Sequence, residues 1–333
     1  MAEIEVPHPR EVFAYDQGEA VEQQFLDALG RGRVHHAWLL CGPEGVGKAT
    51  FAYRAARRLL GAAPDPAHGL LGSKPDSPAS RQIIAHSHPD LMVLERIGDD
   101  GKPRKVIPVD DARRLPEFFS KAPGSAQWRV AIVDSVDDMN PNAANALLKT
   151  LEEPPQRGIL FLVSHAPGGL LPTIRSRCRR LTFRPWSIEA VADFLRGRTD
   201  VNEEAALRLA RMSKGSPGRA LDLAARQAVA VDDTAHELLS RLPEVDYSAM
   251  QVLADSFRGA EGMARFDLLF ERLADRVHSA ELQAAGAGPP QSERWVAAWE
   301  LLNILPREVE GLNLDRADAL WNAVEALRSA ARA

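Results

Sequence analysis

The chain has 333 residues, of which 45% are hydrophobic and 26% charged, and its formal net charge is −5. This composition is that of a folded chain and excludes a disordered one, and the length predicts two or three domains rather than one core. Proteins that wrap nucleic acid unaided are usually basic, so any DNA contact of this acidic chain is expected to be local or shared with partners.

Cysteine content and hydropathy indicate the compartment. Cys41 and Cys178 are the two cysteines, too few for a disulfide framework or a four-thiolate zinc site. The first ten residues mix Glu, Pro, His and Arg without an apolar segment, so no secretory signal is expected. No stretch approaches the roughly 20 apolar residues of a membrane span. These features predict a soluble protein of the reducing cytoplasm.

The first half of the chain alternates short apolar runs with helical patterns. The runs that predict buried strands are 37–41, 90–94, 129–134, 159–163 and 181–183. Helices are predicted over 49–60, from 110, over 142–151 and from Pro172. This alternation predicts a parallel sheet with helices on both faces.

Beyond residue 186 the pattern becomes entirely helical. Helices are predicted over 188–196, 203–212 and 219–230, with a Gly-Ser-Pro-Gly break at 215–218, and a further helical region begins near Pro243. Apolar residues then recur at three- and four-residue spacing. They are Phe266, Leu269, Phe270, Leu273, Val277, Trp295, Trp299, Leu302, Leu320, Val324 and Leu327. A helical domain core explains this spacing more simply than stripes that face only a partner.

The sequence GPEGVGK over 42–48 matches the phosphate-binding loop through its lysine. Its glycines allow backbone torsions that aim N–H groups at phosphates where a helix begins, and Lys48 adds a positive charge. An apolar strand before the loop and a helix after it supply the expected context. That context disfavours the alternative of a glycine-rich turn without a ligand.

The residue after the loop lysine departs from the pattern. A Ser or Thr hydroxyl normally ligates Mg²⁺ there, and this chain has Ala49. Thr50 follows, but one helical residue turns a side chain by about 100°, so Thr50 is expected to point away from the metal. Weak or absent ATP binding is therefore predicted.

A second departure follows the strand that ends in Asp134, which occupies the position of the second-motif aspartate. Hydrolysing proteins typically have Glu next, whereas this chain has Ser135, which cannot act as a general base. Asp137 and Asp138 could substitute, but solvated acids at a helix start are the more ordinary interpretation. The two departures together predict that the chain's own ATPase activity is lost.

Two long segments carry a resemblance to a known family. They are 142–155 (NAANALLKTLEEPP) and 170–178 (LLPTIRSRC), the second ending in a Ser-Arg-Cys motif. The chain resembles the AAA+ clamp-loader family, strongly over 34–219. Within it the chain is most similar to the delta-prime subunits of bacterial DNA polymerase III, because the SHAP sequence over 164–167 and the degraded ATP motifs suit that subunit better than the motor.

The resemblance implies a fold and a set of domains. The expected fold is an α/β P-loop domain of the AAA+ RecA-like class over 1–185. A helical lid domain over 186–235 and an all-α collar domain for oligomerisation over 236–333 follow it.

The resemblance also implies site residues. Arg177 would be an arginine finger that acts in trans on the ATP of a neighbouring motor subunit, a task suited to a guanidinium. Its local sequence alone suggests only a solvated surface arginine. Ser164 would occupy the sensor-1 position and Arg219 the sensor-2 position. The candidate nucleotide-binding set is Gly42, Gly45, Gly47, Lys48, Thr50, Asp134, Ser164 and Arg219.

The implied function is that of a mostly non-hydrolysing clamp-loader subunit that helps load the sliding clamp onto primed DNA during replication. Its partners would be motor and delta subunits in a hetero-pentamer, the sliding clamp and the DNA backbone, with Arg104, Lys105 or the arginines around Arg177 as candidate phosphate contacts. One alternative is the ATP-hydrolysing motor of the same loader, which Ala49 and Ser135 disfavour. Another is an unrelated P-loop kinase, which the segment 145–155 and the helical last third disfavour.

Metal binding is not expected. Some members of the family carry a four-cysteine zinc module after the P-loop helix, but the segment 61–80 has no cysteine and is expected to be a surface insertion, mobile in character. His86, His88 and Asp90 could suggest a metal site. A His-Pro-Asp stretch that leads into a strand is the simpler interpretation.

Overall fold

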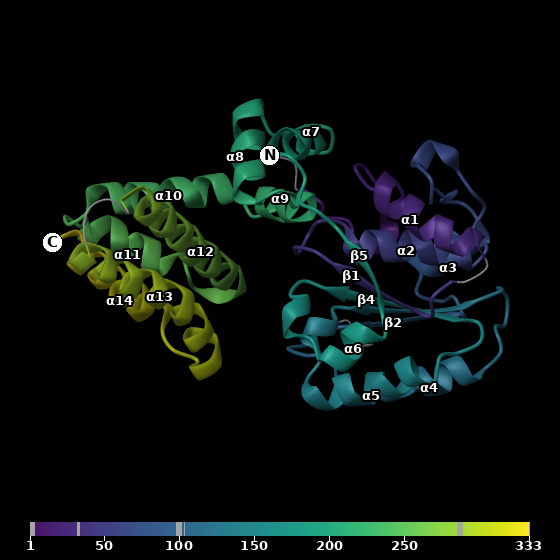
Figure 1. Ribbon diagram of the computed structural model, residues 1–333. Coiled ribbons are helices and arrows are strands. Elements are labelled where there is room, and N and C mark those ends of the chain that lie inside the picture. The colour runs from purple at the N-terminus through teal and green to yellow at the C-terminus, as the bar shows by residue number, and fades with distance from the viewer. Residues whose placement is uncertain (1–3, 32–33, 98–101, 103, 285–288, 333) are drawn as a thin grey trace. The chain divides into compact units, whose positions relative to one another are not determined.

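The computed structural model describes residues 4–31, 34–97, 102, 104–284 and 289–332. The chain forms two compact units, Met1–Asp222 and Leu223–Ala333 (Figure 1). The three-domain division at residues 185 and 235 stays a prediction. Within the described residues, no helix is long and apolar enough to cross a membrane.

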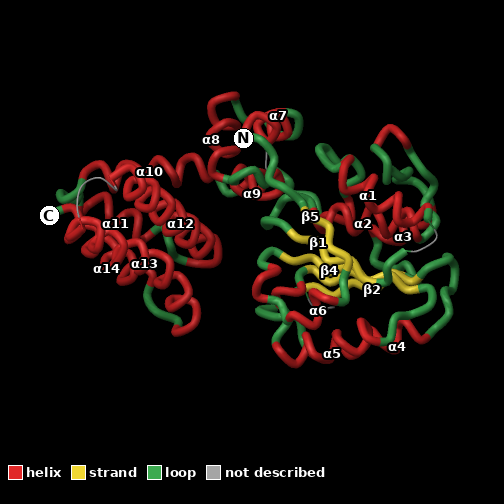
Figure 2. The backbone as a smooth tube through the Cα atoms, viewed as in Figure 1, coloured by secondary structure: helices red, strands yellow, loops and turns green. Residues whose placement is uncertain are grey.

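Over the described part of the first unit, five strands form a parallel sheet in the order β2-β3-β4-β1-β5, drawn in yellow in Figure 2. The strands are β1 (Ala37–Cys41), β2 (Leu91–Glu95), β3 (Arg129–Asp134), β4 (Gly158–Ser164) and β5 (Arg179–Thr182). Each predicted strand is confirmed, with ends shifted by up to two residues. Cys41 pairs with Ser164, and Asp134 with Val163, so three strand ends meet at one edge.

Helices cover both faces of this sheet, as predicted (Figure 1). On one face lie α1 (Glu19–Gly30), α2 (Lys48–Leu59) and α3 (Pro78–Ile84), and on the other α4 (Val109–Ser120), α5 (Pro141–Glu152) and α6 (Pro172–Ser176). Side chains alternate along β1, so Trp38 enters the core under α1 and α2, and Leu39 enters the core under α5. Helix α1 was not predicted, although Phe25 and Ala28 supply a buried helical spacing.

The segment 61–80, expected to be a mobile surface insertion, is exposed at about half of its residues, but the others pack against the domain, and its mobility stays a prediction. The buried Arg54 of α2 forms an ion pair with Glu22 of α1 at 2.7 Å, and the segment satisfies the polar atoms that this pair leaves over. Arg54 donates to the carbonyl of His68 at 2.7 Å, and Glu22 accepts from the N–H of Leu71 at 3.0 Å. Buried charges need such partners, which explains why a Gly- and Pro-rich sequence packs here.

The helical part begins with α7 (Ile188–Arg196) and α8 (Glu203–Met212), which match their predicted bounds. The single helix predicted over 219–230 is wrong, because the chain forms α9 (Pro217–Ala225) and a separate α10 (Ala228–Arg241). Gln227 between them adopts the left-handed conformation with φ +53°. Neither Gly nor Pro marks this break, so the apolar pattern alone could not reveal it.

The second unit continues with α11 (Tyr247–Asp255), α12 (Gly259–Ala284), α13 (Pro289–Leu312) and α14 (Arg316–Ala331). The predicted apolar stripes form its core: Phe266, Phe270, Leu302, Leu320 and Leu327 are each buried. Trp295 and Trp299 of α13 are half-buried. The interpretation as a domain core is confirmed for the buried residues.

Candidate functional site

The P-loop connects β1 to α2, so the predicted strand–loop–helix context is confirmed. Gly45 and Gly47 have φ of +74° and +96°, a region that side-chain-bearing residues rarely adopt. A Cβ at Gly45 would lie 2.6 Å from the backbone nitrogen of Arg219, and one at Gly47 would lie 2.6 Å from the ring of Tyr15. Both glycines are therefore required by torsion and by space.

Two other segments pack directly on this loop. The N–H of Gly218, in α9, donates to the carbonyl of Gly45 at 2.8 Å. The partly buried ring of Tyr15 lies against Gly47 on another side. Arg219, the predicted sensor-2 residue, is thus brought to the loop through its backbone. Tyr15 was missed, because no local motif links it to a loop some thirty residues further on.

Lys48 is buried, with 3% of its surface exposed. Its ammonium donates to the carbonyls of Gly42 (2.6 Å) and Pro43, and contacts Nδ1 of His165 at 3.0 Å. Burial lowers the pKa of Lys48 to about 8, against the opposing effect of Asp134. Burial and Lys48 also lower the pKa of His165, which suits a neutral ring that accepts a hydrogen bond. An ammonium has three donors, so these contacts engage all of them.

Asp134 ends β3 at the same edge of the sheet. Burial raises the pKa of its carboxyl to about 6, and the neighbouring carboxylate of Glu95 adds to this, while Lys48 opposes it. Glu95 is the register partner of Asp134 on β2. The positive charges near the Asp134 carboxylate therefore do not offset the cost of its burial. This condition is typical of a carboxylate that binds a cation, such as a metal ion that also holds an anion.

The acids after β3 do structural work, so the interpretation of them as simply solvated is wrong. Asp137 accepts from the hydroxyl of Ser164 at 3.0 Å and from two backbone N–H groups after β4 at 2.7 and 3.2 Å. Asp138 accepts from the hydroxyl of Ser135 at 2.8 Å. Ser164, the predicted sensor-1 residue, is thus held by the turn after β3, and both oxygens of Asp137 are engaged.

The remaining predicted residues occupy two places. Thr50 lies in the first turn of α2, and its orientation relative to a metal stays a prediction. Arg177 follows α6, with about a third of its side chain exposed (36%). Its guanidinium pairs with Glu152 at 3.1 Å and donates to the carbonyl of Thr173 at 3.1 Å. Among the described contacts, none joins Arg177 to Lys48 or Asp134.

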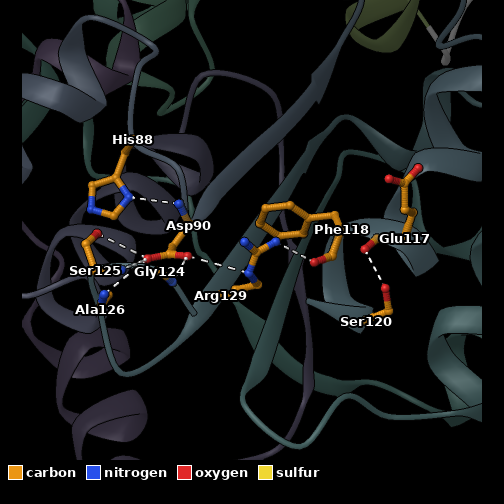
Figure 3. A network of polar contacts seen from close by, with 9 residues as sticks. All are labelled: His88, Asp90, Glu117, Phe118, Ser120, Gly124, Ser125, Ala126 and Arg129. Atoms are coloured by element: carbon orange, nitrogen blue, oxygen red, sulfur yellow. Dashed lines mark hydrogen bonds and ion pairs between the residues drawn. The ribbon is translucent and has the colours of Figure 1, made fainter. Parts of the chain in front are cut away.

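The His-Pro-Asp stretch lies before β2 and forms a structural network (Figure 3). Asp90 accepts from the N–H groups of residues 124, 125 and 126 at 2.8, 2.8 and 3.1 Å and pairs with Arg129 at 3.5 Å. Nδ1 of His88 accepts from the N–H of Asp90. These atoms therefore have protein partners. In the described ranges, no group of three or more His, Cys, Asp or Glu side chains is placed to hold a metal, and the absence of zinc stays a prediction.

Comparisons with known proteins point in one direction. A family model described as "DNA polymerase III, delta subunit" matches residues 17–187. The chain is 38% identical to the DNA polymerase III subunit delta' of Pseudomonas aeruginosa over 56% of this chain and 55% of the relative. It is 33% identical to the same subunit of Escherichia coli over 60% and 58% of the two chains. The chain thus spans a little over half the length of these curated relatives.

The comparisons extend to a solved structure. A DNA polymerase III gamma subunit-related protein from Thermotoga maritima is 20% identical, with a TM-score of 0.48 over 92% of this chain and 100% of that one.

Proposed function

The chain belongs to the DNA polymerase III delta-subunit family, and from this membership we propose that it is a clamp-loader subunit that acts on the ATPase of a neighbour. Its α/β domain is of the AAA+ P-loop type, as predicted. In this proposal its partners are the motor and delta subunits of a hetero-pentamer, the sliding clamp and the backbone of primed DNA. It works in the cytoplasm and needs no zinc.

The contacts of the Lys48 ammonium are the observation that supports weak or absent ATP binding by this chain. All three donors of its ammonium are engaged by the loop itself and by His165. A phosphate would have to displace at least one of these partners. Ala49 offers no hydroxyl to Mg²⁺ and Ser135 no base to water, so little is available to compensate. ATP therefore binds weakly or not at all in this chain's own loop.

Arg177 carries the active part of the proposal. A guanidinium stays charged at every relevant pH and offers a rigid fork to a transferring phosphoryl group. The side chain is partly exposed and follows the short helix α6, so a neighbouring subunit can reach it. It lies apart from the contacts of the chain's own P-loop, which fits action in trans.

A rebuilt loader tests both parts at once. Arg177→Ala is expected to lower the DNA-stimulated ATPase kcat by about 10³-fold while the assembly stays intact in size-exclusion chromatography. Lys48→Ala in this chain is expected to leave that rate unchanged, because the proposal assigns no ATP turnover to this chain's own loop.

Two results would contradict the proposal. Normal ATPase activity of a loader with Arg177→Ala would contradict the role of Arg177 as an arginine finger. Loss of ATPase with Lys48→Ala, together with ATP turnover by the isolated chain, would make this subunit a motor.

A further inference from the structure

Two elements hold the guanidinium of Arg177. Glu152, the last residue of α5, forms an ion pair with one terminal nitrogen, Nη2, at 3.1 Å. The carbonyl of Thr173, in α6, accepts from the other terminal nitrogen at 3.1 Å. The arginine is therefore held from two directions by groups that belong to different helices.

This pair of contacts leaves much of the guanidinium available. The group has five N–H donors in a fixed plane, and the hydrogen bond to the Thr173 carbonyl engages one of them. No described hydrogen bond engages the other four, including Nε–H, although Nη2 forms the ion pair with Glu152. Because the side chain is 36% exposed, these donors can reach a ligand while the ion pair with Glu152 stays intact.

The charge around Arg177 makes Glu152 the important partner. Arg175, Arg179 and Arg180 lie within three residues along the chain, so the guanidinium sits in a positively charged stretch. Without a carboxylate, mutual repulsion and rotamer freedom would spread the side chain over many orientations. Glu152 is about half exposed (52%), so the pair contributes little to folding stability, and its consequence is orientation.

We propose that Glu152 is a positioning residue for Arg177. With the Thr173 carbonyl it holds the guanidinium so that the remaining donors face a phosphoryl oxyanion in the ATP site of the neighbouring subunit. Orientation in advance removes part of the loss of freedom on engagement and aligns the fork with the oxygens. The inference rests on the proposed function of Arg177 as a finger in trans.

Glu153 provides a matched control. It is the next residue, it is exposed, and no described ion pair or hydrogen bond involves its side chain. Glu153→Ala changes the net charge of the chain and the composition of the motif in the same way as Glu152→Ala. A comparison of the two variants therefore separates the contact with Arg177 from general electrostatics.

The experiment measures DNA-stimulated ATPase in the rebuilt loader. Glu152→Ala is expected to lower kcat by about tenfold with an unchanged KM for ATP, since a small misplacement of a positioned group costs up to about 10²-fold. Glu152→Gln keeps an acceptor oxygen and is expected to recover most of the rate. Glu153→Ala is expected to match the wild type. In an Arg177→Ala background, Glu152→Ala is expected to have no further effect.

The outcomes separate the inference from its premise. If Arg177→Ala abolishes the rate but Glu152→Ala equals Glu153→Ala, the positioning role is overturned and the finger stands. The role is also overturned if Glu152→Ala lowers the rate by the same factor with and without Arg177. If Arg177→Ala itself has the wild-type rate, the proposed function fails and this inference fails with it. Thermal unfolding of the isolated chain is expected to be unchanged in each variant.

Discussion

Asp90 and Asp134 lie at opposite ends of two paired strands, and their surroundings differ. Asp90, before β2, is fully buried, and although burial acts to raise its pKa, the donors of Gly124, Ser125 and Ala126 hold that pKa below its ordinary value. Asp134, at the end of β3, has a pKa raised to about 6 by burial and by Glu95. One carboxylate is satisfied by the fold, and the other is left short of positive charge.

This difference separates a structural edge of the sheet from a functional one. At the amino edge, every oxygen of the buried acid is matched within the chain, which joins the loop after α4 to β2 and β3 (Figure 3). At the carboxyl edge, Asp134 lies close enough to Lys48 for each to shift the other's pKa. Ligands of open α/β sheets bind at the carboxyl ends of strands, and at that edge this chain keeps an acid whose pKa is raised by burial.

The largest change in unfolding free energy is expected on replacement of Asp90. Asp90→Asn removes the charge that four donors and Arg129 surround, and breaking such a buried pair costs about 3 kcal/mol of unfolding free energy. Because the folded pKa of Asp90 is lowered, its contribution is present above the unfolded pKa and is lost as pH falls through the folded one. The penalty should therefore shrink in acid. Denaturant unfolding at pH 7 and near pH 3 measures it.

Asp110→Asn is the control for that change, because Asp110 is an exposed acid of α4 whose ion pair among the described residues is with Arg113 on the same helix. It should alter stability by well under 1 kcal/mol. If the Asp90→Asn chain is as stable as this control, the proposed difference between the amino and carboxyl edges of the sheet is contradicted.

Replacement of Asp134 is expected to change the stability in the opposite direction. Asp134→Asn should stabilise the isolated chain by about 2 kcal/mol at pH 8, because one pKa unit corresponds to about 1.4 kcal/mol. The folded pKa is raised, so the carboxyl favours folding most below its unfolded pKa and this advantage is lost as pH rises through about 6. The gain from Asn should therefore vanish near pH 4. Destabilisation at pH 8 would show that Asp134 has partners of its own.

The smallest effect concerns a single donor. Ser125→Ala removes the hydroxyl that lies 3.2 Å from Asp90 and leaves the backbone N–H of the same residue in place. A hydrogen bond to a charged group contributes about 1.5 to 3 kcal/mol, and the three remaining N–H donors moderate the loss to about 1 kcal/mol. Unfolding of the variant at pH 7 gives the value. A loss as large as that of Asp90→Asn would mean that the hydroxyl dominates the network.

The success of the sequence predictions depended on how local the signal was. The strands were found because strands buried on both faces read as continuous apolar runs. The starts of α7 and α8 agree with the prediction, and in the structure Ser187 and Asn202 cap them with side-chain acceptors. The packing of 61–80 was missed, because it depends on the buried pair of Arg54 and Glu22, which no local pattern displays.

The candidate site shows the same limit. Lys48, Asp134 and Arg177 are readable because motifs place them at a loop, at a strand end and after a proline-led helix. The residues around them come from elsewhere in the chain. Tyr15 lies against Gly47 of the loop, Glu152 pairs with Arg177, and His165 is 117 residues from the lysine that it contacts. Pattern and spacing therefore identify the residue types available for chemistry. Which donors and acceptors are already engaged depends on distant backbones that meet only when the sheet and its two helical layers assemble.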